Sequence, residues 1–254
     1  MTEIKIGLVE ALVLARKGSK ALPGKNMMKL GTAPLICYSI AAGLLCKGIE
    51  NTYFSSDSEE MMAIADSMGA KVPFKRPFDI SGDNATDLDV IKHFLDWYFK
   101  DNGFLPEYLV QLRPTLPFRK ISWIDDCISL AQLNNFGCVR TITDPDQTPY
   151  KMWTRNSNGT IKPFIQIKGT NDAFNLPRQH LPKVYYHTGQ IDVIKSSMVI
   201  DEDTLTGSNV YGYQTGIEYN VDIDAKKDFE KAEENLDFLC DPIIKKHLLG
   251  LQGL

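Results

Sequence analysis

Several features that would place this chain in a common class are missing from its sequence. Its 254 residues carry a net charge of −4, so it lacks the basic excess that gives nucleic-acid binders their affinity for phosphates. No run approaches the ~20 apolar residues of a membrane span, and residues 1–5 lack the charged-then-apolar order of a signal peptide. We therefore expect a cytoplasmic protein with no nucleic-acid or membrane partner.

Cysteine and histidine patterns of known chemistry are also absent. The five cysteines are an odd number without C-x-x-C spacing, which indicates neither a disulfide framework nor a zinc site. The four histidines are scattered, and no G-x-S-x-G motif occurs. The sequence predicts reduced, buried thiols and gives no support to hydrolase chemistry.

A basic loop with two glycines, residues 15–26 (ARKGSKALPGKN), is the most informative segment that is present. It follows the apolar residues 11–14, and open α/β sheets bind ligands beyond the carboxyl ends of their strands. Glycines let backbone N–H groups approach phosphate oxygens, and Arg16, Lys20 and Lys25 can neutralise them. The loop therefore predicts a triphosphate site.

Common nucleotide motifs do not explain this loop. Counting from Gly18, the pair Gly24-Lys25 falls one position late for a Walker A motif, and Asn26 replaces its Ser or Thr. A G-x-G-x-x-G fingerprint is missing as well. A solvated basic connection is the alternative, but the position between a first strand and a long apolar helix favours a nucleotide site.

Strand-like and helix-like patterns alternate along the first 142 residues, which implies a largely parallel sheet and a Rossmann-like α/β sandwich. The expected strands are 11–14, 51–54, 72–74, 108–112 and 138–142. The expected helices are 34–45, a segment opened by a Ser56/Glu59 capping box and ending at Met68, 88–99 and 121–133. A strand at 218–224 and an amphipathic helix at 226–239 would close a single domain over residues 1–254.

Residues 144–186 break this alternation. They are rich in Pro, Asn, Gly and aromatic side chains, and Trp153, Asn158-Gly159 and Phe164 suggest a hairpin outside the main sheet. We interpret the segment as an insertion.

Two carboxylates near the end of the chain form a candidate metal site. Asp222 and Asp224 are two residues apart on the expected strand, so their side chains share a face and can converge on one hard cation such as Mg²⁺. The alternative is a solvated strand end in which Asp224 caps the following helix.

The order of the basic loop resembles the A-R-x-G-S-K-x-x-P-x-K-N signature of the acylneuraminate cytidylyltransferases, which make CMP-activated sialic acids and related nonulosonic acids. Further matches follow in the family's order at Arg76-Pro77, 114–119 (PTLPFR), 177–182 (PRQHLP) and 222–224 (DID). The resemblance spans about residues 11–233. It implies a Rossmann-like nucleotidyltransferase that converts CTP and an acidic nonulosonic sugar into a CMP-sugar and pyrophosphate.

The resemblance also implies roles for individual residues. Ser19, Asn26 and Arg76 match nucleotide contacts, Arg76 helping to recognise the base, and Asp222 and Asp224 match the family's magnesium ligands. The implied catalytic set is Arg16, Lys20, Lys25, Asp222 and Asp224, with Arg16 also binding the nucleotide. Asp57, at a strand end, is left out because helix capping explains it.

For the acceptor, the resemblance implies a homodimer built by the 144–186 insertion, with Arg178 reaching the partner's sugar. A rim salt bridge is the alternative role for Arg178. Arg113 and Thr188 stand where sialate-activating members carry Gln and Asn facing the sugar, and Gln190 starts another departure. We expect Arg113, Arg178, Thr188 and Gln190 to bind the acceptor, while His187 makes a structural hydrogen bond.

Arg113 supports an alternative function, because a fixed positive charge favours a more anionic acceptor such as a sugar phosphate. That alternative is a sugar-1-phosphate nucleotidyltransferase of the same fold, with GTP as a possible donor. A second alternative is a regulatory protein that binds nucleotide without turnover.

Overall fold

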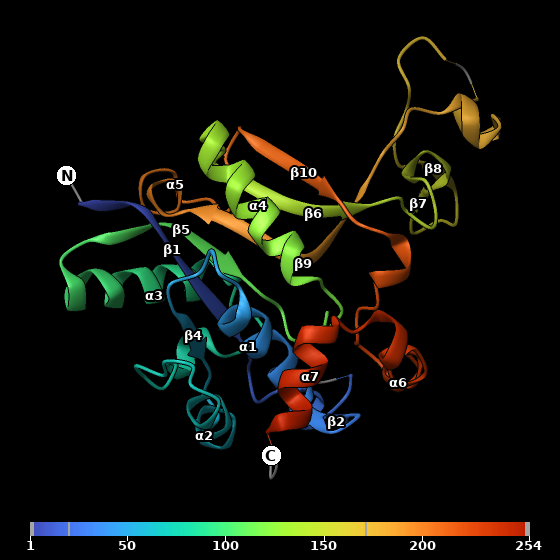
Figure 1. Cartoon of the computed structure of the whole chain (residues 1–254). Helices are drawn as coiled ribbons and strands as arrows, with labels where there is room; N and C mark the ends of the chain where they lie inside the picture. The colour runs from blue at the N-terminus through green and yellow to red at the C-terminus, as the bar shows by residue number, and fades with distance from the viewer. Residues whose placement is uncertain (1–2, 20, 171, 252–254) are drawn as a thin grey trace.

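The computed structural model describes residues 3–19, 21–170 and 172–251. Its centre is a six-stranded sheet in the order β10-β6-β9-β5-β1-β4 (Figure 1). The strands are β1 (Ile4–Leu14), β4 (Thr52–Ser55), β5 (Leu105–Gln111), β6 (Cys138–Thr143), β9 (Tyr186–Lys195) and β10 (Val210–Gln214). Two short strands, β2 (Lys29–Leu30) and β3 (Ala33–Pro34), form a separate pair. In the chain they follow the basic loop of residues 15–26, which we call the phosphate loop.

The sheet is mainly parallel, as the alternation of patterns predicts. β1 pairs in parallel with β4 and β5, and β10 pairs in parallel with β6. Only β9 runs against its neighbours in this sheet, between β5 and β6. β9 therefore brings residues 186–195 into the middle of the sheet, a placement that the sequence did not predict.

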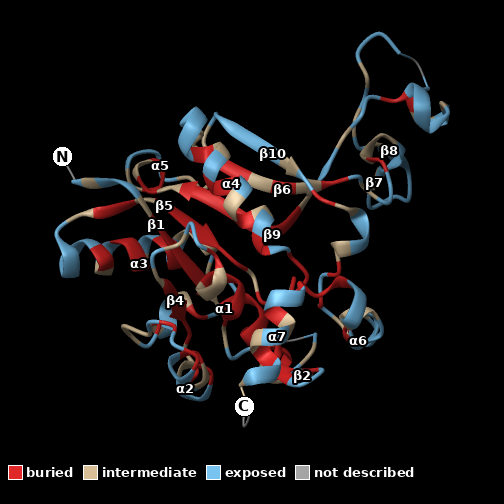
Figure 2. Ribbon diagram, viewed as in Figure 1, coloured by how far each residue is buried: buried red, intermediate tan, exposed pale blue. Residues whose placement is uncertain are grey.

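Helices cover both faces of the sheet (Figure 1), and much of the sheet is buried (Figure 2). The buried apolar side chains form two clusters. Successive side chains of β1 point to opposite faces of the sheet, so Ala11 and Val13 belong to the larger cluster and Leu12 belongs to the smaller one. The larger cluster includes side chains of α1 (Leu35–Leu45), α2 (Glu59–Ser67), α4 (Ile121–Asn134), α6 (Lys226–Leu239) and α7 (Pro242–Gly250), and the smaller one those of α3 (Asp87–Asn102) and α5 (Ser196–Glu202).

Three local predictions were wrong. Residues 72–74 form no strand, because only Lys71 makes a single bridge, to Tyr53. Residues 218–224 form no strand either: a short 3-10 turn, Ile217–Tyr219, precedes an irregular segment. Helix α2 is capped by Ser58, whose hydroxyl accepts from the Met61 N–H at 3.4 Å, and not by Ser56.

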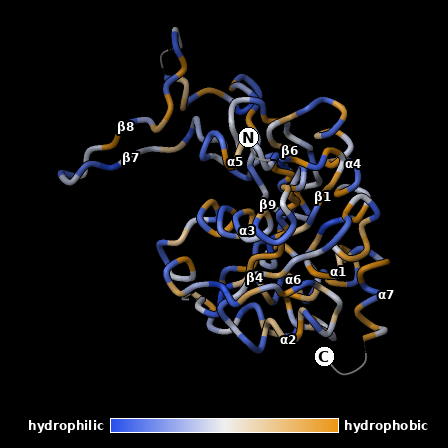
Figure 3. The backbone as a smooth tube through the Cα atoms, turned by 90° about the vertical axis from the view of Figure 1, so that its left-hand side faces the viewer, coloured by the Kyte–Doolittle hydropathy of each residue, from blue (hydrophilic) through white to orange (hydrophobic). Residues whose placement is uncertain are grey.

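The 144–186 segment projects from the sheet (Figures 1 and 3). It contains the hairpin expected around Asn158-Gly159, made of β7 (Trp153–Arg155) and β8 (Ile161–Pro163) in antiparallel pairing. Trp153 and Phe164 remain 41% and 60% exposed. All five cysteines are buried free thiols, as predicted. In the part of the chain that the structure describes, no helix has the length and apolar character to cross a membrane.

Candidate functional site

A cavity of about 480 Å³ opens where β1 and β5 end. This is the edge of a parallel sheet at which α/β proteins bind ligands. Several residues selected from the sequence line it: Arg16, Ser19, Lys25, Asn26, Arg76, Arg113 and Asp224. The cavity therefore gathers segments that are more than 200 residues apart in the chain.

The phosphate-loop cations are held by carboxylates at this cavity. Arg16 donates from Nη1 to Asp83 Oδ1 at 2.9 Å and to the Gly82 carbonyl at 3.0 Å. Lys25 donates from Nζ to Asp224 Oδ1 at 2.9 Å and to the Ile223 carbonyl at 2.7 Å. The side chains of Asp83 and Asp224 are 46% and 71% exposed, so an incoming anion can take their place on the two cations.

Asn26 and Arg76 also line the cavity. Asn26 is buried and donates from Nδ2 to the Arg16 carbonyl at 3.1 Å, while its Oδ1 has no hydrogen-bond partner among the described residues. Arg76 donates from Nε to Ser55 Oγ at 3.0 Å and from Nη2 to the Ser55 carbonyl. Burial lowers the pKa of Arg76 to about 10, which still leaves it charged at neutral pH.

The two aspartates of the candidate metal site keep the alternation expected of them. Val221 and Ile223 are buried, whereas Asp222 and Asp224 are exposed. Removal of water by the surrounding protein and the nearby Asp224 charge raise the pKa of Asp222, while a hydrogen bond from Thr115 opposes this shift. Two neighbouring carboxylates are the oxygen ligands that a hard divalent cation prefers, so these residues fit Mg²⁺. Within the described ranges no group of three or more His, Cys, Asp or Glu residues is placed to hold a metal, so the remaining ligands would be phosphate oxygens and water.

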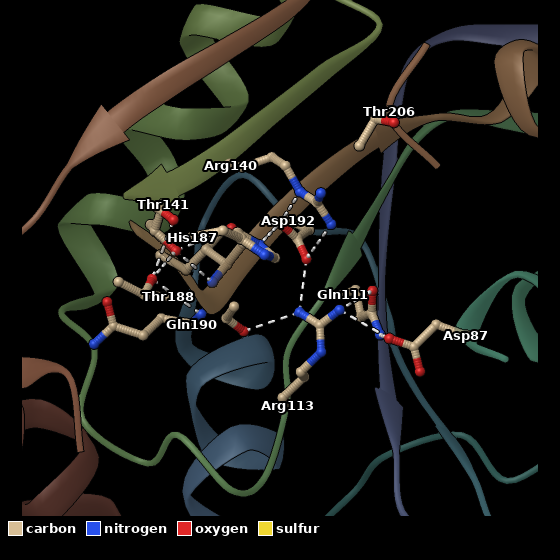
Figure 4. Close-up of polar contacts among 12 residues, drawn as sticks. Asp87, Gln111, Arg113, Arg140, Thr141, His187, Thr188, Gln190, Asp192 and Thr206 are labelled. Atoms are coloured by element: carbon tan, nitrogen blue, oxygen red, sulfur yellow. Dashed lines mark hydrogen bonds and ion pairs between the residues drawn. The ribbon is translucent and has the colours of Figure 1, made fainter. Parts of the chain in front are cut away.

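Arg113 lies at the cavity but its guanidinium is already engaged (Figure 4). Nη1 donates to Asp192 Oδ2 at 2.6 Å and to the Gly189 carbonyl at 3.1 Å. Nη2 donates to Asp87 Oδ2 at 2.8 Å and to Gln111 Oε1 at 3.3 Å. Both terminal nitrogens therefore donate twice within the protein. The positive charge of Arg113, which we expected to favour an anionic acceptor, is paired with the carboxylates of Asp87 and Asp192.

Asp192 is the buried centre of this network. Its side chain is 0% exposed, and its carboxylate accepts hydrogen bonds from Arg113, from Nε of Arg140 at 2.8 Å and from Nε2 of His187 at 2.9 Å. Burial alone would raise its pKa, but the hydrogen bond from His187 and the two guanidinium charges hold it well below the usual aspartate range. For Arg113, burial disfavours the charge, and Asp192 and Asp87 outweigh that effect and raise its pKa.

Thr188 and Gln190 are not brought to the cavity. Thr188 Oγ1 donates to Thr141 Oγ1 at 2.7 Å, and Gln190 donates from Nε2 to the carbonyls of Phe118 and Tyr219 at 2.7 and 2.9 Å. Both side chains are buried on β9, and these internal bonds satisfy them. We therefore remove both from the acceptor-binding set, because they join β9 to neighbouring segments.

The remaining sequence candidates lie elsewhere. Arg178 is in the projecting segment, where it donates to the Pro145 and Asp146 carbonyls at 2.6 and 3.4 Å beside a separate cavity of about 310 Å³. Within the described chain it does not reach the main cavity. Lys20 lies outside the described residues.

Sequence reasoning missed several residues that shape the site. Asp57 does not cap a helix but accepts from the Lys17 N–H at 2.7 Å, and so orients the phosphate loop. Arg119 is fully buried and donates to the carbonyls of Arg113 and Leu116 at 2.7 and 2.5 Å, which fixes the loop after β5. Arg119 also donates from Nη1 to Ser39 Oγ at 2.7 Å, and Ser39 is 80 residues away in the sequence. Asp87 and Asp192 likewise give no local signal of their role.

A family model described as Cytidylyltransferase matches residues 10–241 of the chain. An N-acylneuraminate cytidylyltransferase of Streptococcus agalactiae serotype V is 30% identical over 222 residues, which cover 86% of this chain and 51% of that protein. A Post-translational flagellin modification protein B of Campylobacter coli is 26% identical over 224 residues, which cover 87% of this chain and 92% of that protein. The chain thus spans about half the length of the first of these relatives.

A solved structure shares the fold. It is a CMP:2-keto-3-deoxy-manno-octonic acid synthetase complexed with CTP, which superposes with a TM-score of 0.66 over 91% of this chain and 98% of that chain. At 13% identity the likeness is one of fold, and it agrees with the mainly parallel α/β sheet.

Proposed function

Since the chain belongs to the cytidylyltransferase family, we propose that it transfers CMP from CTP to an acidic nonulosonic sugar and releases pyrophosphate. The observation that carries this proposal is the cavity itself, which joins Arg16 and Lys25, the buried side-chain amide of Asn26 and the carboxylate of Asp224 at one sheet edge. The activated sugar would then serve a glycosyltransferase.

Arg16 and Lys25 would bind the triphosphate by exchanging their carboxylate partners for phosphate oxygens. Because both cations are already charged and positioned, the exchange needs little reorganisation. Catalysis would then come from in-line positioning of the acceptor hydroxyl and neutralisation of the leaving pyrophosphate. No covalent enzyme intermediate is needed.

Mg²⁺ is part of the proposal, with Asp222 and Asp224 as its protein ligands. When bound, the ion would neutralise charge that develops on the phosphate oxygens. Asp224 would exchange its contact with Lys25 for the ion, which would leave Lys25 available to phosphate.

The free acceptor atom at Asn26 supports a pyrimidine amino group as the ligand. Oδ1 of Asn26 is buried at the cavity without a partner among the described residues, and an unsatisfied buried acceptor is costly unless a ligand donates to it. The exocyclic amino group of cytosine is such a donor.

For the acceptor we favour an acidic sugar over a sugar 1-phosphate. The argument for a phosphate rested on the charge of Arg113, and Asp192 and Asp87 already balance that charge. The acidic sugar is the acceptor class indicated by the name of the Streptococcus agalactiae relative.

A homodimer and a cytoplasmic location belong to the same proposal. The exposed side chains of Trp153, Ile161 and Phe164 make the projecting segment suitable for self-association, and Arg178 on it would reach a partner's acceptor. Reaction with the cellular CTP pool would place the protein in the cytoplasm. Light scattering on the purified chain, with a Trp153→Ser variant as comparison, tests the dimer.

The decisive experiment measures pyrophosphate release with Mg²⁺, pairing CTP or GTP with a nonulosonic acid or a panel of sugar 1-phosphates. Turnover with CTP and the acid is expected. Turnover only with a sugar 1-phosphate would contradict the proposed acceptor. Tight CTP binding with no pyrophosphate from any pair would indicate a regulatory protein instead.

A further inference from the structure

The cavity contains a carboxylate that the proposed function leaves without a role. Asp87 is the first residue of α3 and lines the cavity. Its Oδ2 accepts from Nη2 of Arg113 and from Nε2 of Gln111, both at 2.8 Å. Among the described residues Oδ1 has no hydrogen-bond partner, and the side chain is 43% exposed. One oxygen of this carboxylate is thus available to a ligand.

The position of Asp87 is fixed from two directions. A capping box fixes the start of α3, since Thr86 Oγ1 accepts from the Asp89 N–H at 3.2 Å and Asp89 Oδ2 accepts from the Thr86 N–H at 2.9 Å. From the other side, Arg113 is held by the fully buried Asp192 and so presents Nη2 to Asp87 at a set place. A group supported in this way is preorganised for a ligand.

We propose that Oδ1 of Asp87 accepts a hydrogen bond from a hydroxyl group of a sugar ring bound in this cavity, with Arg113 and Asp192 as positioning residues. An ionised carboxylate only accepts, so it selects hydroxyl donors and disfavours phosphate or carboxylate groups at the same spot. The ribose of the nucleotide and a polyhydroxylated acceptor both offer such hydroxyls. The identity of these two ligands rests on the proposed function.

Equilibrium binding separates the two sources of the hydroxyl. Dissociation constants would be measured for CTP, for 2′-deoxy-CTP and 3′-deoxy-CTP, and for a nonulosonic acid added to protein saturated with a non-hydrolysable CTP analogue. Asp87→Asn is the test variant. Asp96→Asn is its control, because Asp96 is an exposed aspartate on the same helix.

A hydrogen bond to a charged group corresponds to about a 10- to 100-fold change in Kd. Asp87→Asn should therefore raise the Kd of one ligand by that factor, and Asp96→Asn should leave the Kd of both ligands unchanged. If the ribose is bound, one deoxy-CTP binds the wild type weakly and the variant changes its Kd no further. If the acceptor is bound, only the Kd of the acid changes. Unchanged Kd values for both ligands, in an Asp87→Asn protein that melts normally, would overturn the proposal.

Arg113→Lys tests the positioning step. A lysine keeps the charge beside Asp192 but cannot present a second fixed nitrogen to Asp87. We expect it to weaken the same ligand as Asp87→Asn does, with no further loss in the double variant. A purely structural role for Arg113 would lower the melting temperature and leave both Kd values alone. Should the wild type bind CTP without releasing pyrophosphate, the proposed function fails, and the deoxy-CTP comparison still decides whether Asp87 binds the ribose.

Discussion

Cations at two sides of the cavity look equivalent in sequence and differ in structure. Arg16 and Lys25 pair with carboxylates that are 46% and 71% exposed, whereas Arg113 pairs with Asp87, which is 43% exposed, and also with Asp192, which is 0% exposed. Because Asp83 and Asp224 are exposed, each carboxylate can return to water when a phosphate takes its place on the cation. The Arg16–Asp83 pair, which is exposed on both sides, contributes only about 0–1 kcal/mol. A buried pair cannot be opened in this way, because the remaining charge would be left without water or a partner.

The comparison shows that the exposure of the partner decides what a cation at the site can do. A cation with a replaceable partner is suited to bind a ligand, and one with a buried partner is suited to hold other groups in place. By this criterion we propose that Arg16 and Lys25 bind the ligand and that Arg113 positions other groups.

The largest effect on stability is expected from Asp192→Asn. The variant removes the buried carboxylate that Arg113 and Arg140 share and leaves Arg113 with only the exposed Asp87, which should lower the free energy of unfolding by about 3–5 kcal/mol in urea titrations at pH 7. Asp96→Asn is the matched control. A loss below about 1 kcal/mol, the scale of exposed pairs, would contradict the buried role.

The same residue gives a pH dependence. The folded-state pKa of Asp192 is lowered, so its stabilisation is complete above the unfolded value of about 3.9 and is lost as the pH falls from there toward the folded pKa. Below about pH 4 the wild type should therefore lose stability more steeply than Asp192→Asn. Parallel acid-unfolding curves would count against this account.

The next effect is catalytic. Asp224→Asn removes one of the two proposed magnesium ligands and should lower kcat by about 100-fold or more, with a higher Mg²⁺ requirement. Glu230→Gln, an exposed change on α6, serves as control. Near-normal kcat at low Mg²⁺ would remove Asp224 from the metal site.

A smaller effect is expected at the glycine that Arg113 contacts. Gly189 has φ +76°, and a Cβ there would lie 3.0 Å from Nη1 of Arg113. Gly189→Ala should cost about 1–2 kcal/mol of backbone strain plus the displacement of Arg113. Gly103 has φ +80° with nothing within 4 Å of such a Cβ, so Gly103→Ala gives the strain alone. Equal losses in the two variants would mean that the Arg113 contact is unimportant.

Much of the fold followed from local patterns. Helices such as α3 and α4 appear close to their expected bounds because their apolar spacing is set within the segment. Strand β9 was not predicted, since its place between β5 and β6 depends on pairing with segments far away in sequence. The strand expected at 72–74 failed for the same reason, because a strand-like pattern forms a strand only where a partner is available.

The site divides in the same way. The phosphate-loop residues and Asp224, which line one cavity, could be selected from the sequence, because the loop and the sheet edge are recognisable there. The sequence could not show that the Arg113 guanidinium is paired within the protein, since its partner Asp192 is 79 residues away. Thr188 and Gln190 were chosen by position in a motif, and the motif did not reveal that both face the protein interior.

The most direct test of this account compares Arg16→Gln with Arg113→Gln, measuring Kd for CTP and for CMP by calorimetry together with the melting temperature. The difference in affinity between CTP and CMP isolates the contribution of the β- and γ-phosphates. We predict that Arg16→Gln reduces this difference by about 10-fold, the scale of one charge-assisted contact, with little change in melting temperature. Arg113→Gln should leave the difference intact and lower the melting temperature. A loss of the CTP–CMP difference in Arg113→Gln, with Arg16→Gln unaffected, would contradict the division between ligand-binding and positioning cations.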